Sequence, residues 1–534
     1  MVRYPGWMAK HFQKGLTFQR AGIELGSVNG VLVLASLIVA ACRYVWPGRG
    51  AIGRPLNGTH DSSWWAWWDQ GKYLDAARAW AEGNLDPAQH WYLPGYPLLG
   101  APFVRLMPAQ PFEIPDALCL LATLWLFTRL AGWLAPNRRW MPGVAALVFL
   151  AANVFWTRLM DAWITPWTTT PAAPLTLAAL LATIAFMERP RSRSAFAAGV
   201  LGASVGLFRP ADAVALILSI APFIAGATLL SEGTSWQRVR MIGCAALGGL
   251  IVGSILLATH AAIYGFARSP YLIESGRIGF EWRLIPIRWV TLFISPRPLF
   301  AEGYGLARTF WWIVPGLAGI VVALTTSRRI ALARHALVIA TVLLHCAYYL
   351  AYRDLHPTGL WRFNNYHYFK WVIPVFDLYA TLLPILIVRS ARSWRLVATA
   401  VATIVAAFCW QARFVPEETG SVEIAGPHAL RITDGFPRVS SGIMVKANAS
   451  FEAAYFGRHE MRIGDQTFHV YSDFRIFPEG DLVLIVPLRP MPPGVADITL
   501  DSGVTIDQAA MPIAGTQRVV PSLPCWFRAI CPDF

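Results

Sequence analysis

The carboxylate of Asp69 directly follows a cluster of tryptophans, formed by Trp64, Trp65, Trp67 and Trp68. Such clusters are typical of the interface between a membrane and water, where the amphipathic indole ring is at home. A carboxylate held beside them loses hydration, which costs free energy unless a cation or a bound molecule partners it. Two interpretations of Asp69 are open: an acid that complements the dipole at a helix N-terminus, or a general base at the membrane surface.

The residues after Asp69 predict a helix that begins near this carboxylate. Residues at helical spacing follow it and would share its face: Lys72, Tyr73, Ala76 and Trp80. We expect the preceding tryptophans to lie at the membrane surface and to hold the carboxylate at the height of lipid phosphates.

The composition of the chain predicts a membrane protein. Of its 534 residues, 55% are hydrophobic and 14% are charged, and the mean hydropathy is +0.45. Apolar segments of about 20 residues, long enough to cross roughly 30 Å of hydrocarbon, recur along most of the chain. We expect about eleven transmembrane helices, at 22–45, 115–135, 141–157, 171–187, 195–208, 211–230, 241–262, 309–326, 330–351, 371–388 and 396–412.

Basic clusters in the short loops predict the orientation, because Lys and Arg collect on the cytoplasmic side. They fall in every second loop, which indicates a cytoplasmic N-terminus: Arg138-Arg139, ERPRSRS (188–194), WQRVR (236–240), SRRIALAR (327–334) and RSARSWR (389–395). The loops 46–114 and 260–308 and the C-terminal region are therefore expected outside. The sequence shows no cleavage site after the first apolar run, so we expect no cleavable signal peptide.

The C-terminal region has a different pattern from the rest of the chain. Alternating segments such as MRIGDQTFHVYSDFRIF and DLVLIVPLRP, separated by Gly and Pro, indicate strands. Residues 413–534 hold 10 Lys and Arg against 14 Asp and Glu. We therefore expect a transmembrane domain at 1–412 and a small β-rich domain outside the membrane at 413–534.

The external loop 260–308 is rich in arginine, which the orientation rule does not explain. Arg268 is one of its arginines, and Glu274 is one of the fewer acids. Arginine here could bind phosphate or anionic lipid head groups, for which the guanidinium fork is well matched. The alternative is an interfacial arginine whose charge reaches toward water. The sequence contains no HExxH, Walker or dinucleotide-binding motif.

Residues 69–106 resemble the first external loop of the integral-membrane glycosyltransferases of the C superfamily (GT-C), such as lipid A aminoarabinose transferases and protein mannosyltransferases. The match covers Asp69, Tyr73, Ala77-Arg78, Gly83, His90 and Pro94-Gly95-Tyr96-Pro97. It departs at Gln70, where the family usually has a second carboxylate. For this reason we expect no metal ion and no other cofactor, although the family pattern allows a divalent cation.

Two later segments resemble the same family. GASVGLFRPADAVALIL (202–218) is similar to its Gly-rich short helix ending in Arg-Pro, which includes Arg209. WRFNNYHYFKWVIP (361–374) is similar to its aromatic and basic entry to a late span, which includes Arg362, His367 and Lys370. The resemblance covers most of residues 20–390 and implies a GT-C-like α-helical polytopic membrane fold.

The resemblance also implies a reaction: inverting transfer of a sugar from a polyprenyl-phosphate donor to an acceptor outside the membrane. Such a displacement needs a base on the acceptor and positive charge at the departing phosphate. Asp69 is the expected base, and Asp161 in TRLMDAWITPW matches the family's second acid position. The expected substrate-binding residues are Tyr73, His90, Tyr96, Arg209, Arg268, Arg362, His367 and Lys370.

The expected partners are the lipid-linked sugar donor, membrane lipids and an acceptor that is a glycan, a lipid or a protein, with no nucleic acid. The expected location is the bacterial cytoplasmic membrane, with the C-terminal domain in the periplasm. Two alternatives remain: a lipid-linked polysaccharide polymerase or ligase, and a flippase or transporter. A transporter would place its polar residues within the spans, whereas the charges here lie mainly in external loops.

The two last cysteines, Cys525 and Cys531, lie close together in CWFRAIC, in the region expected to face an oxidising compartment. This placement predicts a disulfide. A membrane-impermeant thiol reagent applied to intact cells should label both cysteines only after reduction. Labelling without reductant would contradict the pairing.

Overall fold

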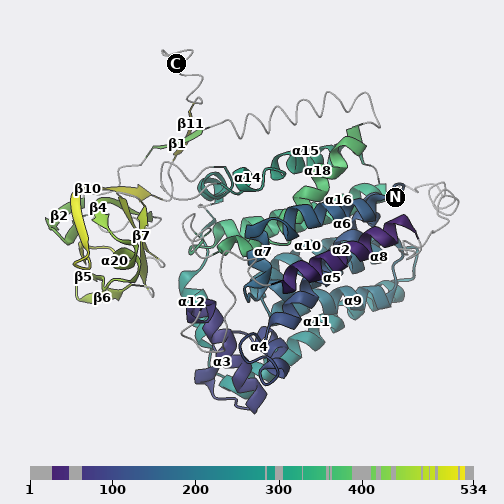
Figure 1. Ribbon diagram of the computed structural model, residues 1–534, viewed down its shortest axis with the longest axis horizontal. Helices are drawn as coiled ribbons and strands as arrows, with labels where there is room; N and C mark the ends of the chain where they lie inside the picture. Colours follow the sequence, from purple (N-terminus) through teal and green to yellow (C-terminus); the bar gives the residue numbers. More distant parts are fainter. Residues whose placement is uncertain are drawn as a thin grey trace.

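The computed structural model describes residues 27–46, 63–282, 285–294, 305–327, 329–355, 360, 364–387, 411–415, 422–433, 440–470, 473–479, 482–487, 491–514 and 518–522. These residues form a large helical part and a smaller β-rich C-terminal part (Figure 1). The predicted fold class, a polytopic α-helical chain with a C-terminal β-rich region, is confirmed.

Six helices within the described residues are long and apolar enough to cross a membrane. They are α2 (Val28–Val45), α5 (Glu113–Leu134), α8 (Thr169–Glu188), α10 (Pro210–Leu229), α11 (Ser235–Tyr264) and α16 (Arg329–Ala351). A seventh span would be the pair formed by Met141–Val154 and Thr157–Ile164, whose two halves are bent by 85°.

Other predicted spans are shorter in the structure. Residues 309–326 and 371–388 contain α15 (Ile313–Thr326) and α18 (Val372–Ile387), and α9 (Ser192–Ser204) overlaps the span predicted at 195–208. Residues 396–410 of the last predicted span lie outside the described residues. The expectation of about eleven spans therefore stays a prediction.

Short helices connect the long ones and carry much of the polar sequence. Between α2 and α5 lie η1 (Ser63–Ala66), α3 (Trp68–Glu82), η2 (Pro87–Gln89), α4 (Gly95–Gly100) and η3 (Ala101–Phe103). Further along the chain are α6 (Met141–Phe149), α7 (Thr157–Ile164), η5 (Val205–Leu207), α12 (Pro270–Ile278), α13 (Ile285–Arg288), η7 (Trp289–Ile294), α14 (Leu306–Thr309) and η8 (Asn365–Phe369). Helices α3 and α4 pack together at one end of the helical part (Figure 1).

Glycines let two pairs of helices approach closely. A Cβ on Gly248 of α11 would meet the carbonyl oxygen of Phe196 on α9 at 2.5 Å, and one on Gly316 of α15 would meet the carbonyl oxygen of Phe376 on α18 at 2.3 Å. Both distances are shorter than any side chain could tolerate. Small residues at such contacts are a common way for helices to associate within a membrane, where burying apolar surface supplies little drive.

The C-terminal part contains two larger antiparallel sheets and a two-stranded ribbon. The five-stranded sheet has the order β2 (Val422–Gly426), β3 (Ala429–Ile432), β9 (Ala496–Thr499), β5 (Glu460–Ile463), β6 (Gln466–His469). The four-stranded sheet has the order β10 (Val504–Ala514), β4 (Ser440–Ala449), β8 (Leu482–Pro487), β7 (Phe474–Glu479), and α20 (Phe451–Phe456) packs against β7. Strands β1 (Gln411–Val415) and β11 (Arg518–Ser522) pair with each other.

The alternating segments of the sequence form strands as predicted. MRIGDQTFHVYSDFRIF contains most of β5, all of β6 and the start of β7, and DLVLIVPLRP contains β8. The two larger sheets share a core that includes Ile432, Ile463, Phe468 and Ile485. Alternation predicts strands well here because each strand turns one set of side chains toward this core.

The close helix contact at Gly248 can be tested with a control on the same helix. Gly248→Ala should lower the free energy of unfolding by about 1–3 kcal/mol, because the added methyl group must push α9 away. Gly253→Ala is the control, since a Cβ there meets nothing within 4 Å. Replacing this helical glycine should be neutral or stabilising by about 0.5–1 kcal/mol. Thermal unfolding in detergent measures both, and equal stability of the two variants would contradict the contact.

Candidate active site

Asp69 lies in the first turn of α3, as predicted, and a tyrosine from the following loop holds its side chain. The Tyr92 hydroxyl donates to Oδ1 of Asp69 at 2.5 Å. The Tyr92 ring packs against Tyr73 on α3, with centroids 4.7 Å apart, and against Tyr271 on α12, with centroids 5.2 Å apart. Three segments of the chain therefore fix the position of this carboxylate.

The surroundings of Asp69 make its carboxyl a stronger base than an exposed aspartate. Protein atoms surround the carboxyl on most sides although the residue keeps some exposure to solvent. Burial raises its pKa, while the hydrogen bond from Tyr92 and the positive charge of Arg209 lower it in part. The net shift is upward. A raised pKa increases the basicity of the ionised carboxylate, which is what a general base requires.

Arg209 precedes α10 and contacts several segments that are far apart in the sequence. Its Nη2 and Nε donate to the Tyr349 hydroxyl of α16 at 2.6 and 3.1 Å, and its Nη1 donates to Oγ1 of Thr168 at 3.0 Å. Asp212 lies 3.4 Å from Nε and also accepts a hydrogen bond from the Tyr349 hydroxyl. The guanidinium carbon lies 4.8 Å from the centroid of the Tyr368 ring.

The segment 166–170, which runs from the connection after α7 into the first turn of α8, meets polar side chains from distant parts of the chain. Gln70, next to Asp69, donates its amide to the carbonyl oxygen of Pro166 at 2.9 Å. Lys370 donates to Oγ1 of Thr170 and to the carbonyl oxygen of Ala162, both at 2.7 Å. Together with the bond from Arg209 to Thr168, these contacts place the start of α3 and two basic residues around one connection.

His367 also contacts this segment but does not serve as a cation. Its Nδ1 is hydrogen bonded to Oγ1 of Thr169 at 3.0 Å, and its ring stacks on Trp167 with centroids 3.8 Å apart. Burial, with the charges of Lys370 and Arg209, lowers the pKa of His367 well below its ordinary value. The imidazole is therefore neutral. Its buried Nε2 has no hydrogen-bond partner among the residues that the structure describes.

Lys370 is fully buried, and its charge depends on its surroundings. Burial lowers the pKa of its ammonium group to about 7, and the negative charge of Asp116 raises it in part. Its Nζ lies 4.8 Å from the centroid of the Trp163 ring. Arg209 is therefore the member of this group that carries a full charge at neutral pH, because a guanidinium does not lose its proton in proteins.

Two tryptophans of the cluster lie inside the protein and not at the predicted place at the membrane surface. Trp64 and Trp65 are buried within the protein, at 2% and 0% exposure, whereas Trp68 is 61% exposed. The indole Nε1 of Trp65 donates to the carbonyl oxygen of Ala109 at 2.9 Å. The expectation that Trp64 and Trp65 form an interfacial belt is therefore wrong, because both rings are buried within the protein and the chain before α5 accepts the N–H of Trp65.

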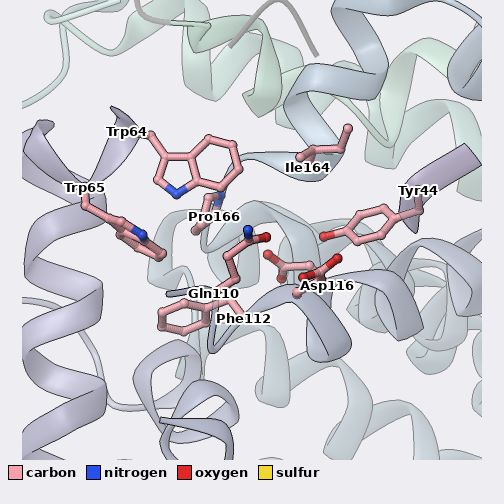
Figure 2. A pocket seen from close by; sticks show the side chains of 9 residues that line it. Tyr44, Trp64, Trp65, Gln110, Phe112, Asp116, Ile164 and Pro166 are labelled. Carbon is pink, nitrogen blue, oxygen red and sulfur yellow. The ribbon is translucent and has the colours of Figure 1, made fainter. Parts of the chain in front are cut away.

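Behind the start of α3 lies a small pocket with a volume of about 10 Å³, which is about the lower limit for holding one water. Figure 2 shows the carboxylate of Asp116 and the hydroxyl of Tyr44 turned toward each other beside Gln110. The other Asp116 oxygen, Oδ2, accepts a hydrogen bond from the Tyr96 hydroxyl at 2.8 Å. Tyr96 is fully buried, so the structure places this predicted substrate-binding residue in the core next to the pocket.

The other predicted site residues lie in different surroundings. Asp161 is buried on α7, and its charge acts on Tyr366. The charges that act on Asp69 are those of Arg209, Asp354 and Arg475. His90 bonds through Nε2 to the carbonyl oxygen of Asn84 at 2.8 Å, which is a contact within its own loop. Arg268 is exposed in the turn before α12. Arg362, Cys525 and Cys531 lie outside the described residues.

The residue next to Asp69, at which the resemblance departs from the GT-C pattern, faces the segment 166–170. Gln70 is fully buried, and its amide is hydrogen bonded to Pro166 as described above. Within the described ranges, no group of three or more His, Cys, Asp and Glu side chains is arranged to hold a metal ion. The absence of a metal or another cofactor stays a prediction.

Sequence reasoning missed several polar residues that the structure brings to this region. They are Tyr92, Thr168, Thr169, Thr170, Asp212, Tyr349 and Tyr368. The one signal available was the run of three threonines after Trp167, which is unusual at the start of an apolar helix. Tyrosines on apolar helices give no such signal, because the sequence does not show which face another helix covers.

The fold as a whole is a polytopic membrane bundle with a folded domain at its C-terminus. The structure is similar to that of ArnT from Cupriavidus metallidurans bound to undecaprenyl phosphate, with 13% identity and a TM-score of 0.46, over 71% of this chain and 64% of ArnT. It is also similar to the apo state of ArnT, with 14% identity and a TM-score of 0.40, over 71% of this chain and 63% of that one. This chain spans slightly less than two thirds of the length of ArnT.

A third solved structure is similar along nearly the whole chain. It is the arabinosyltransferase EmbB from Mycobacterium smegmatis, with 12% identity and a TM-score of 0.29, over 97% of this chain and 66% of EmbB. No protein-family model and no curated protein matches the sequence.

The upward pKa shift of Asp69 predicts a stability effect with a definite sign. Because the folded state holds the proton more tightly than the unfolded state, the free energy of unfolding falls as the pH rises from the unfolded pKa through the folded one. Asp69→Asn removes this cost and keeps an acceptor for Tyr92. The variant should therefore gain stability relative to wild type between pH 4 and pH 7, measured by thermal unfolding at both values. Glu82→Gln, at an exposed position of the same helix, should show no such gain, and an equal response of the two variants would contradict the shift.

Proposed function

We propose that this chain is a membrane glycosyltransferase that transfers a sugar from a polyprenyl-phosphate donor to an acceptor outside the cytoplasmic membrane. The observation that carries the proposal is the arrangement of charge around Asp69. A carboxylate of raised pKa lies within the electrostatic reach of the Arg209 guanidinium. Arg209 and Lys370 both donate hydrogen bonds to the segment 166–170, Arg209 to Thr168 and Lys370 to Thr170.

The proposed reaction is a single displacement. Asp69 takes the proton from an acceptor hydroxyl or amine as its oxygen or nitrogen bonds to the anomeric carbon of the sugar. The bond between that carbon and the phosphate oxygen breaks, and the electron pair leaves with the phosphate. Because a phosphate is a stable anion, its departure requires positive charge and no general acid. The configuration at the anomeric carbon is inverted, and the proton passes from Asp69 to water.

Arg209 is the proposed partner of the departing phosphate. Its guanidinium is held in one orientation by Tyr349 and Asp212, and fixed charges of this kind stabilise a developing anion without having to reorient during the reaction. Lys370 and the polar His367 are proposed to support this position. Arg268 and Arg362 are proposed to attract the donor head group, and Asp161 to orient the acceptor.

The proposed topology places the N-terminus in the cytoplasm and Asp69 and the C-terminal domain in the periplasm. In this arrangement the acceptor is a glycolipid, a polysaccharide or a protein of the cell envelope. The donor reaches the site from the bilayer, because its polyprenyl chain remains among the helices while its phosphate lies at the surface.

The test is release of polyprenyl phosphate from a panel of radiolabelled polyprenyl-phosphate sugars, supplied to the purified protein with its own membrane fraction as the source of acceptor. Asp69→Asn should reduce turnover by about 10²–10⁴, the usual cost of losing a positioned base. Binding of undecaprenyl phosphate, measured by thermal shift, should remain near wild type. Turnover above about a tenth of wild type would place the base elsewhere, and Asp161→Asn would then be the next variant to measure.

A further inference from the structure

An ion pair joins the C-terminal domain to the helical part close to Asp69. Nε of Arg475, on β7, lies 3.2 Å from Oδ1 of Asp354, which follows α16. The two side chains are 20% and 22% exposed, so the pair is largely covered. A covered ion pair between two separately folded parts favours one arrangement of them, because removing either partner leaves the other charge covered and unpaired.

A second contact fixes the direction of the Arg475 side chain. Its Nη1 donates to the hydroxyl of Tyr455 on α20 at 2.9 Å. Tyr455 is itself largely buried, at 8% exposure. The guanidinium is therefore held from its own domain by Tyr455 and from the helical part by Asp354.

This contact lies beside the proposed base. The charges of both Arg475 and Asp354 act on the Asp69 carboxyl, and Asp69 in turn acts on Tyr455. Glu274 on α12 is influenced by the same ion pair. In Figure 1, α12 lies between α3 and the C-terminal domain. Asp69 therefore lies within electrostatic reach of the C-terminal domain and of the residues after α16, and Tyr271 of α12 packs on the Tyr92 ring that holds it.

The two charges of the ion pair act on Asp69 in opposite directions. Arg475 lowers the pKa of Asp69, and Asp354 raises it. Their effects offset each other in part, so the contribution of the pair to the basicity of Asp69 is small. The contribution that remains is geometric, because the pair joins β7 to the residues that follow α16.

We propose that the C-terminal domain covers the acceptor side of the active site, and that the Asp354–Arg475 ion pair holds this cover in place. The proposal rests on the function proposed above. The donor phosphate is assigned to Arg209 among the helices, and the acceptor must lie next to Asp69. The remaining side of Asp69 is the one that the C-terminal domain covers, so this domain determines which acceptor reaches the base. Arg475 is then a positioning residue.

The cover has a second consequence, because water is also an acceptor. If water replaces the acceptor, its oxygen bonds to the anomeric carbon, Asp69 takes one of its protons, and free sugar and polyprenyl phosphate are released. A closed site excludes this hydrolysis. Loss of the ion pair should therefore shift the reaction from transfer toward hydrolysis.

The experiment measures this partition with radiolabelled polyprenyl-phosphate sugar and the native membrane fraction as the source of acceptor. Label transferred to envelope material is compared with label released as free sugar. Arg475→Ala and Asp354→Ala should each lower the ratio of transfer to hydrolysis at least about fivefold. This factor corresponds to the low end of the cost of breaking a partly covered ion pair. The double variant Arg475→Asp with Asp354→Arg should restore most of the ratio, and Arg475→Lys should restore part of it.

Arg431→Ala is the matched control. It breaks an ion pair with Asp497 that joins β3 to β9 within the same domain, at 2.7 Å and about half exposed. This variant should keep the wild-type ratio. A wild-type ratio in Arg475→Ala, or an equal loss in Arg431→Ala, would overturn the proposal.

Hydrogen exchange of the full-length protein separates failure of this proposal from failure of the proposed function. Arg475→Ala should increase exchange in β7, α20 and α12, while Arg431→Ala should not increase it in α12. This result does not require turnover, so it tests the contact even if no donor sugar is transferred. Unchanged exchange in α12 and β7 of Arg475→Ala would show that the ion pair does not hold the domain in place.

Discussion

The guanidinium of Arg209 is the contact on which the rest of the helical part depends. It touches α16 through Tyr349, the segment 166–170 through Thr168, its own helix through Asp212 and η8 through the ring of Tyr368. A charge buried at the end of an apolar bundle is costly unless every donor finds an acceptor. The surrounding helices must therefore meet at one place, and this requirement gathers the polar residues of distant segments there.

The charge of Asp69 is compensated less completely than that of Arg209. Its carboxylate accepts a hydrogen bond from Tyr92 and is influenced by the positive charge of Arg209, yet burial outweighs both and raises its pKa. A carboxylate with a full set of ionic partners would be stable but weakly basic. The incomplete compensation at Asp69 keeps its basicity, and the aromatic rings around Tyr92 keep its position.

The two parts of the molecule divide the proposed substrates between them. The helical part holds Arg209 and Lys370, which suit a lipid phosphate that arrives from the bilayer. The C-terminal domain is joined to the helical part by the Asp354–Arg475 ion pair, and it is proposed to lie on the side of Asp69 where a water-soluble or envelope acceptor would arrive. In the proposed function, this division gives the folded β-rich domain a role beside the apolar helices.

Local patterns in the sequence determined the division into an apolar helical part and a β-rich C-terminal part, and they placed Asp69 in the first turn of a helix. Hydropathy and alternation report which side chains are buried along one element, and this information is local. The tertiary structure decided the partners of these residues. Tyr92, the threonines of the segment 166–170 and Arg475 come from segments whose spacing in the sequence shows nothing of their meeting. Trp64 and Trp65 match the pattern of an interfacial belt, but another part of the chain covers them. The ring of Trp65 would be stable either at a membrane surface or in a core that accepts its N–H, as Ala109 does, and only the packing of distant segments selects between the two.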